Sequence, residues 1–136
     1  FGVEPDPASV EWARRHFPAN AFAVATLEEY VVGGAQKPFD LLYCSEVIEH
    51  APDANRFAGA LAAAVARGGF LYLTTPDITH WRRPKVLAAW DGYKPPEHCL
   101  YFSPSTLRRL LERHGFAVMK TAWAWKPGIK MLARRV

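Results

Sequence analysis

Short apolar runs alternate with stretches of helical periodicity along most of this 136-residue chain. A nearly continuous apolar run, residues 39–44, has the composition of a strand that is buried on both faces of a sheet. Alternation of this kind is typical of α/β folds, in which helices connect parallel strands. We therefore expect a mostly parallel sheet with flanking helices, and strands at about residues 1–4, 21–25, 39–44 and 69–74.

Capping residues indicate where the helices begin. Asp6 is followed by Pro7, and Ser103 by Pro104, so each pair predicts a helix with a polar N-cap and a proline in its first turn. Two further stretches are expected to be helical, a short turn that precedes a Gly33–Gly34 loop and an alanine-rich helix that ends at two glycines; they are residues 27–32 and 53–67.

The last part of the chain has a different pattern. Residues 116–123 and 129–135 predict an antiparallel hairpin, because two apolar stretches flank a Lys-Pro-Gly turn. Residues 76–96 lack a regular period and contain Trp81 and Trp90. We expect this segment to be a lid that lies over the carboxyl-end edge of the sheet and shapes a binding site.

Length and composition limit the class of protein. A chain of 136 residues can form one domain, here residues 1–136, and no run approaches the ~20 apolar residues of a membrane-spanning helix. Two cysteines indicate a reducing compartment, so a cytoplasmic location is expected and no membrane association. Because the chain begins at Phe1 without a signal-peptide pattern, we expect it to be a fragment.

Charge is distributed unevenly along the sequence. Residues 1–53 contain nine acidic and three basic residues, whereas residues 54–136 contain four acidic and fourteen basic residues. A basic half can attract nucleic acid, but these lysines and arginines are scattered and no aromatic RNA-binding motif accompanies them. A solvated basic surface is the favoured interpretation.

Polar residues follow several of the predicted strands. In an open parallel sheet, ligands bind beyond the carboxyl ends of the strands, so these residues predict a site. Glu4 is the most informative of them, because a carboxylate at a strand end can accept hydrogen bonds from a ribose diol; the alternative is a contact with the dipole of the next helix. The other polar strand ends are Thr26, Ser45, Glu46, Thr74, Thr75 and Asp77.

Residues 39–53, FDLLYCSEVIEHAPD, resemble a motif of class I S-adenosylmethionine-dependent methyltransferases. The resemblance is strongest to the ubiquinone-type O-methyltransferases and their uncharacterised relatives. The stretches GVEPDPASVEWAR, GGFLYLTTP and PPEHCLYFSPSTLRRLLERHGF are similar to further parts of that family, so the match covers most of residues 1–120.

The resemblance implies a Rossmann-like α/β fold and an S-adenosylmethionine site. Glu4 would bind the ribose hydroxyls. The remaining cofactor-binding residues implied are Pro5, Thr26 and Leu27 around the adenine and Cys44, Ser45 and Glu46 around the methionine half. Cys44 is alternatively a small buried core residue.

On the acceptor side, His98 could contact or deprotonate a substrate, or brace a loop. Trp81, Trp90 and Tyr101 are the other predicted substrate-side residues, although both tryptophans could equally be packing anchors. Glu49 and His50 are expected to brace the loop behind the methyl-transfer point. Since no His, Cys and carboxylate residues have metal-ligand spacing along the sequence, no metal is predicted.

The family's glycine-rich G-x-G-x-G loop, which precedes the ribose-binding acid, is absent from the 136 residues. The first strand is therefore expected to be missing, cofactor binding to be impaired, and self-association through the resulting gap to become possible.

Three functions are consistent with these residues. The first is methyl transfer from S-adenosylmethionine to an acceptor, a small molecule in the favoured reading. The alternatives are a non-catalytic methyltransferase-like interaction module and an RNA-modifying or RNA-binding protein.

Overall fold

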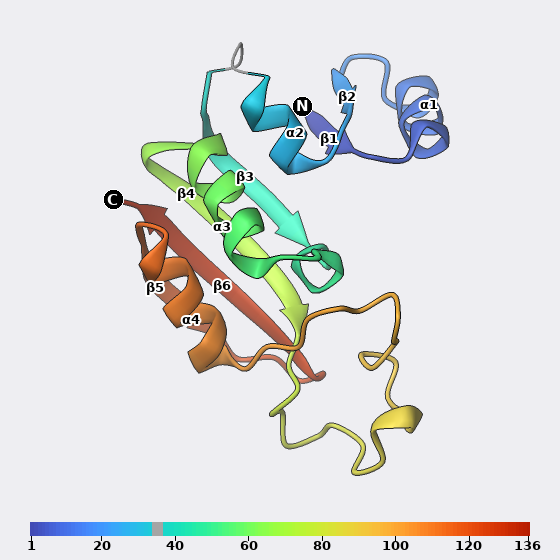
Figure 1. The fold of residues 1–136 in the computed structure, drawn as a ribbon, viewed down its shortest axis with the longest axis vertical. Helices are drawn as coiled ribbons and strands as arrows, with labels where there is room; N and C mark the ends of the chain where they lie inside the picture. Colours follow the sequence, from blue (N-terminus) through green and yellow to red (C-terminus); the bar gives the residue numbers. More distant parts are fainter. Residues whose placement is uncertain (34–36) are drawn as a thin grey trace. The chain divides into compact units, whose positions relative to one another are not determined.

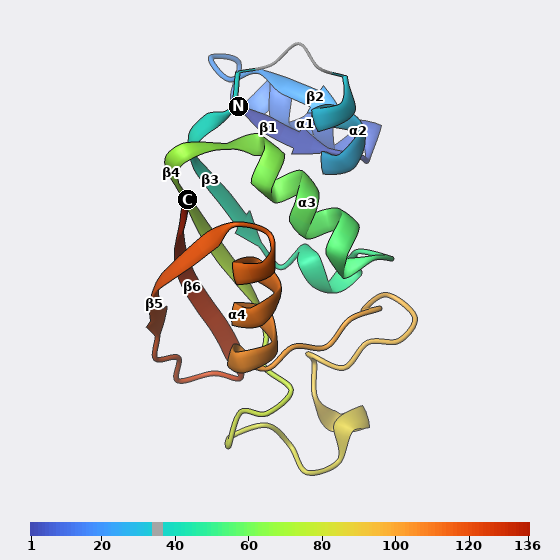
Figure 2. The same ribbon diagram turned by 60° about the vertical axis from the view of Figure 1, so that its left-hand side comes forward.

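The computed structural model describes residues 1–33 and 37–136, and the chain divides into two compact units, Phe1–Lys37 and Pro38–Val136. Residue 34 of the predicted Gly33–Gly34 loop lies outside the described residues. Figures 1 and 2 show the helices and strands of each unit.

The first unit is built around two short parallel strands. Strand β1 (Gly2–Glu4) pairs with β2 (Phe22–Val24), and helix α1 (Pro7–His16) connects them. The side chain of Asp6 accepts hydrogen bonds from the amides of Ala8 and Ser9, so it caps α1 as predicted. Helix α2 (Leu27–Val32) follows β2 and begins at a capping box.

The second unit contains a four-stranded mixed sheet with the strand order β3-β4-β6-β5. Strands β3 and β4 are parallel, whereas β4 pairs antiparallel with β6 and β6 antiparallel with β5. The predicted antiparallel hairpin is confirmed, but the sheet is mixed rather than mostly parallel. The elements of this unit are β3 (Phe39–Ser45), η1 (Ile48–His50), α3 (Ala54–Ala64), β4 (Val65–Pro76), η2 (Leu87–Ala89), α4 (Pro104–Arg113), β5 (Phe116–Ala122) and β6 (Gly128–Arg135).

Helix α3 is shorter than predicted and strand β4 is longer. The sequence predicted a helix to residue 67, ended by two glycines, but α3 ends at Ala64. The β-branched Val65 already pairs with Phe39 of β3. Gly68 has a φ of 82° and bends the early part of the strand instead of capping a helix.

The prediction that residues 39–44 are buried on both faces is wrong. In this sheet β3 is an edge strand, and the side chains of Leu41 and Tyr43 are 64% and 68% exposed. Tyr43 stacks on Tyr72 of the neighbouring strand, with ring centroids 5.6 Å apart. Only the opposite face, which includes Cys44, lies in the core.

Helices α3 and α4 lie side by side on one face of the four-stranded sheet, as Figures 1 and 2 both show. Their apolar faces meet inward-facing strand residues, which forms the core of this unit. The fully buried residues of this core include Leu61, Leu71, Leu73, Leu107, Leu111 and Met131.

Among the described residues, no helix has the length and apolar character needed to cross a membrane.

The segment between β4 and α4 is almost entirely irregular, as predicted, with η2 as its one short helical turn among the described residues. It extends from the carboxyl end of β4, beyond the end of the sheet (Figures 1 and 2). Its two ends meet, because Asp77 forms a parallel bridge with Phe102 and the amide of Ile78 donates to the carbonyl of Phe102 at 3.0 Å. The segment is therefore a closed loop whose two ends meet at the carboxyl end of β4.

Candidate functional site

The polar residues that end β3 and β4 meet, as the sequence predicted for neighbouring parallel strands. Ser45 and Thr74 are register partners, and their hydroxyl oxygens lie 2.7 Å apart. The Thr74 hydroxyl donates to Oε1 of Glu46 at 2.8 Å, so the Ser45 hydroxyl donates to Thr74. These three side chains form one hydrogen-bonded chain at the carboxyl edge of the sheet.

The backbone turns sharply at Glu46. This residue has a φ of 53°, in the left-handed region that non-glycine residues rarely adopt. Its amide still donates to the carbonyl of Thr74 at 3.0 Å, so the turn follows directly on the last strand pairing. The turn leads the chain into η1, which presents Glu49 and His50. Such strained residues concentrate at functional sites.

Glu49 is a buried carboxylic acid with one unsatisfied oxygen. Its side chain is 1% exposed, and Oε2 accepts a hydrogen bond of 2.8 Å from the hydroxyl of Thr75. Among the described residues, Oε1 has no hydrogen-bond partner. Burial raises the pKa of Glu49 above its usual value, and the nearby Glu46 adds to this effect, while hydrogen bonds and His50 oppose it.

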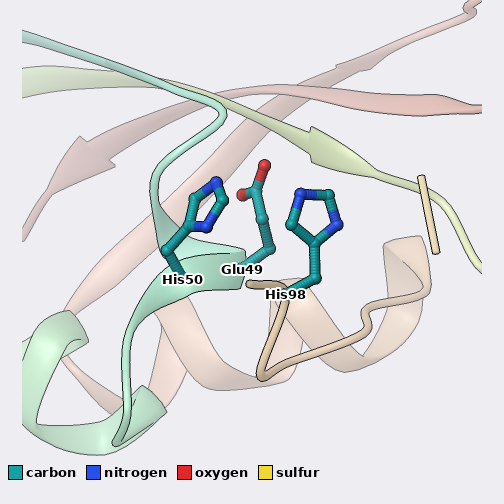
Figure 3. Close-up of side chains that lie close together, drawn as sticks. All are labelled: Glu49, His50 and His98. Atoms are coloured by element: carbon teal, nitrogen blue, oxygen red, sulfur yellow. The ribbon is translucent and has the colours of Figure 1, made fainter. Parts of the chain in front are cut away.

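Two histidines face Glu49, one from η1 and one from the irregular segment (Figure 3). Nδ1 of His50 lies 2.9 Å from the carbonyl oxygen of Glu97, and Nδ1 of His98 lies 2.9 Å from that of Gly92. A carbonyl oxygen only accepts, so each Nδ1 carries the proton that it donates. In the neutral rings, the lone pair is consequently on Nε2 of both histidines.

Backbone hydrogen bonds bring His98 to this position although it is far from Glu49 in the sequence. The amides of Cys99 and Leu100 both donate to the carbonyl oxygen of Glu49, at 2.8 and 3.0 Å. The rings of His50 and His98 are then edge to face, with centroids 4.7 Å apart. His98 is only 9% exposed, so the backbone, and not solvent, fixes its orientation.

The three side chains make a cluster that the sequence analysis missed. Ligand atoms of Glu49, His50 and His98 all lie within 4.8 Å of one another. No metal-ligand spacing is seen along the sequence, but these three side chains meet in space, and the absence of a metal stays a prediction. Spacing along the chain could not reveal the cluster, because the second histidine comes from beyond β4; the similarity of the segment around His98 to a family motif was the only signal.

In the first unit, the predicted cofactor residues form local contacts. Oε1 of Glu4 accepts from the amide of Asp6 at 3.0 Å, which is a contact at the start of α1. The hydroxyl of Thr26 accepts from the amide of Glu29 and donates to its carboxylate, so Thr26 is the N-cap of α2. Pro5 is exposed and Leu27 half-buried. The predicted roles of these residues toward a cofactor stay predictions.

Cys44 lies in the core of the second unit. It is 5% exposed, and burial, assisted by the charge of Glu49, raises its pKa to about 12. A thiol with this pKa stays protonated at neutral pH and is a poor nucleophile. The structure therefore favours the interpretation of Cys44 as a small buried residue over any thiol chemistry.

The predicted substrate-side residues separate into two places. Tyr101 lies near the cluster, with its ring centroid 6.4 Å from that of His98 and 5.3 Å from that of Tyr93. Trp90 is 8% exposed and packs in the irregular segment, whereas Trp81 is 71% exposed. The guanidinium of Arg82 lies 5.2 Å from the ring of Trp81 and 4.0 Å from that of Trp125.

The sequence pattern of a family described as "Methyltransferase domain" matches residues 1–121. The chain belongs to the methyltransferase domain family. The resemblance to class I S-adenosylmethionine-dependent methyltransferases is thereby confirmed, and so is the likeness to the ubiquinone type. This methyltransferase domain is 28% identical over 132 residues to the ubiquinone biosynthesis O-methyltransferase of Methylobacterium sp. (strain 4-46), covering 88% of this chain and 51% of that protein.

Solved structures share the fold of the methyltransferase domain at low sequence identity. The trans-methyltransferase CalH in complex with SAH (S-adenosylhomocysteine) matches with a TM-score of 0.76 and 18% identity, over 98% of this chain and 42% of that one. Magnesium protoporphyrin IX methyltransferase (ChlM) from Synechocystis PCC 6803, with bound SAM, matches with a TM-score of 0.63 and 16% identity, over 99% and 58%. The domain thus spans about half the length of its curated relative and of these structures.

Proposed function

We propose that this methyltransferase domain transfers the methyl group of S-adenosylmethionine to a small-molecule acceptor. The family match over residues 1–121 is the observation that supports this function most strongly. In the reaction, a nucleophilic atom of the acceptor attacks the methyl carbon, the carbon–sulfur bond breaks, and its electron pair returns to sulfur. The protein then mainly positions the two reactants and excludes water.

The proposed cofactor residues lie at or shortly after the carboxyl ends of β1, β2 and β3. Glu4 would accept hydrogen bonds from the ribose hydroxyls, and Ser45 and Glu46 would contact the methionine half. The hydrogen-bonded chain of Ser45, Thr74 and Glu46 supports this role, because it fixes polar groups at a strand end where ligands of such folds bind. The remaining cofactor residues in the proposal are Pro5, Thr26, Leu27 and Cys44.

We also propose that the chain has a Rossmann-like fold. Along the chain, β1, β2, β3 and β4 alternate with α1, α2 and α3, which is the order of a Rossmann-like fold. Solved methyltransferase structures match 98–99% of the chain, which supports it.

On the acceptor side, we place His98 and Tyr101, with Trp81 at the exposed part of the segment. The buried Trp90 acts through packing of that segment. That His98 serves as a base stays a prediction.

The cofactor assignment is tested by isothermal titration of S-adenosylmethionine into the whole protein. Glu4→Ala should weaken binding by about 1.5–3 kcal/mol, the value of hydrogen bonds to a charged group, because the ribose hydroxyls lose an ionised acceptor. Glu11→Ala is the matched control, since it removes an exposed carboxylate of the same unit that pairs with Arg15 on its own helix. Unchanged affinity in a folded Glu4→Ala protein would show that the ribose assignment is wrong.

A second variant distinguishes an effect on folding stability from an effect on cofactor binding. Leu61→Ala, which truncates a buried side chain of α3, should lower the free energy of unfolding by roughly 2–5 kcal/mol. It should leave the affinity of the remaining folded protein almost unchanged. A non-catalytic module without a cofactor site would show no binding in either the parent or the control.

The arginines of the basic half argue against an RNA-binding function. Several of them donate to backbone carbonyls within the second unit: Arg67 to Val136, Arg134 to Gly68 and Arg135 to Ala62. Their charge is therefore partly used to hold the fold together. The cytoplasmic location and self-association of the chain stay predictions.

A further inference from the structure

We infer that a patch formed by Trp81, Arg82, Trp123 and Trp125 binds an acidic, partly apolar segment of another protein. The inference does not depend on the proposed methyl transfer, because Arg82, Trp123 and Trp125 have no part in that proposal. Trp81 belongs to both proposals, so a partner bound to the patch would border the acceptor side.

Two segments that are distant in the sequence build the patch. They are the beginning of the irregular segment and the turn between β5 and β6, which lie side by side in Figures 1 and 2. The amide of Asp77 donates to the carbonyl oxygen of Pro127 at 3.4 Å. The His80 ring accepts from the amide of Arg82 through Nδ1 at 3.1 Å, so its Nε2 donates to the carbonyl oxygen of Ala124 at 3.0 Å. These contacts hold the two segments together.

The patch exposes three tryptophan side chains. Trp81, Trp123 and Trp125 are 71%, 70% and 59% exposed. The rings of Trp123 and Trp125 pack edge to face with centroids 5.5 Å apart, so they form one apolar surface and not scattered single residues. Grouped apolar side chains at the surface mark interaction sites, and tryptophan is among the residues that contribute most to binding at interfaces.

Both segments are basic and contain no acid. Residues 78–90 and residues 119–130 each contain three lysines or arginines and no aspartate or glutamate. Among the residues that the structure describes, the ion pairs lie within α1 and within α4, so no carboxylate neutralises these six side chains. A positive surface of this kind attracts an acidic partner. The six residues are Arg82, Arg83, Lys85, Lys120, Lys126 and Lys130.

Arg82 connects the charge to the rings. Its guanidinium lies 4.0 Å from the centroid of the Trp125 ring and 5.2 Å from that of Trp81, and both distances are within the range of cation–π contacts. The guanidinium makes no hydrogen bond among the described residues. Its planar donors are therefore available to a carboxylate, which a guanidinium binds with two parallel hydrogen bonds.

The position of Arg82 favours a protein partner over nucleic acid or a membrane. Bases of single-stranded nucleic acid stack on the faces of aromatic rings, but the guanidinium already lies over the rings of Trp81 and Trp125. At a membrane, tryptophan rings lie at the interface and basic groups near the phosphates, whereas here the charge lies against the rings. A peptide can present a carboxylate and an apolar side chain next to each other, so an acidic segment fits the patch best.

The test measures the binding of a defined acidic probe to the whole protein by fluorescence anisotropy. A fluorescein-labelled copolymer of glutamate and tyrosine supplies carboxylates and rings, and polyglutamate of the same length supplies carboxylates alone. We expect the copolymer to bind more tightly than polyglutamate, and its binding to weaken as salt screens the charges. Arg82→Gln and Trp125→Ala, which change exposed residues, should each weaken copolymer binding by about tenfold or more, as substitutions at interface hot spots do.

Arg113→Gln and Trp12→Ala are the matched controls. Each removes an exposed side chain of the same type outside the patch, Arg113 from the end of α4 and Trp12 from α1. Both should leave the affinity for the copolymer unchanged. Circular dichroism verifies that all four variants are folded.

Three results would overturn the inference. These are no binding of the copolymer by the folded parent, binding that Arg82→Gln and Trp125→Ala both retain in full, and tighter binding of phosphatidylglycerol vesicles or of oligo(dT) that the same two substitutions abolish. The last result would assign the patch to a membrane or to nucleic acid. None of them bears on the titration of S-adenosylmethionine, so the two proposals can fail separately.

Discussion

At the residue scale, burial assigns different roles to side chains of the same type. Cys44 faces the core while Cys99 is exposed, although both are free cysteines. Glu49 is buried beside two histidines while Glu97 is exposed. The chemistry available to each residue therefore follows from its position in the fold and not from its type.

The two cysteines allow a direct test of this difference. At about pH 8, a thiol reagent should label Cys99 and leave Cys44 unmodified, because only the thiolate of an accessible cysteine reacts. Mass spectrometry of the folded chain should show one label, and the denatured chain two. Rapid labelling of Cys44 in the native protein would contradict the burial that the structure gives it.

The same residue predicts a dependence of stability on alkaline pH. Burial and the charge of Glu49 raise the pKa of Cys44 from 9.0 to about 12. Above its ordinary pKa the unfolded chain loses a proton that the native state keeps, so this contribution to the free energy of unfolding is complete below about pH 9 and is lost as the pH rises toward 12. Urea unfolding across this range should show a smaller alkaline loss in Cys44→Ser than in the parent.

At the element scale, the glycines of α3 and β4 differ in how much space surrounds them. Gly59 is in the interior of the helix, and the nearest atom to an added Cβ, Nδ1 of His114, would be 3.9 Å away. Gly69 is in the strand, where an added Cβ would lie 2.9 Å from the carbonyl oxygens of both Ala66 and Asp40. The close approach of backbone at Gly69 coincides with the register shift between Phe39 and Leu41 in β3.

These two positions form a matched pair of Gly→Ala substitutions. Gly59→Ala should raise the free energy of unfolding by about 0.5–1 kcal/mol, because alanine loses less backbone entropy in a helix. Gly69→Ala should lower it by about 1–3 kcal/mol, because the backbone of β3 and β4 must move apart. Chemical denaturation measures both, and equal effects of the same sign would show that the strand pairing near Gly69 is described incorrectly.

At the scale of the whole molecule, contacts between distant parts of the chain hold the second unit together. Arg135, near the end of β6, donates to the carbonyl of Ala62 in α3 at 3.1 Å and to that of Gly115, after α4, at 2.7 Å. One side chain thus connects the sheet to both helices that cover it. These carbonyls belong to helix ends, which need partners outside the helix.

We expect Arg135→Ala to lower the free energy of unfolding by about 1.5–3 kcal/mol, since hydrogen bonds to a charged group are lost and helix-end carbonyls lose a partner. Lys130→Ala, an exposed lysine on the same strand, should change it by no more than about 0.5 kcal/mol. Thermal unfolding followed by circular dichroism compares the two. A similar loss in both variants would indicate that net charge, and not the connection through Arg135, determines stability.

Local signals were sufficient to predict most elements of this protein. Asp6 and Ser103 cap α1 and α4 as their sequence contexts predicted, because capping depends on neighbours within a few residues. The motif at residues 39–53 correctly indicated the methyltransferase family. The polar strand ends Ser45 and Thr74 could be predicted to meet for another reason, because β3 and β4 were expected to be parallel neighbours, whose carboxyl ends share one edge of the sheet.

Pairing between distant segments decided the rest. The position of β6 between β4 and β5 made the sheet mixed, and the edge position of β3 left Leu41 and Tyr43 exposed in a run that looked fully buried. The helix signal of residues 65–67 yielded to the pairing of Val65 with Phe39. Likewise, only the docking of Cys99 and Leu100 on Glu49 brought His98 to the cluster. Sequence alone determines what depends on neighbouring residues, whereas strand order, burial and the arrangement of Glu49, His50 and His98 depend on contacts whose partners the chain brings together only on folding.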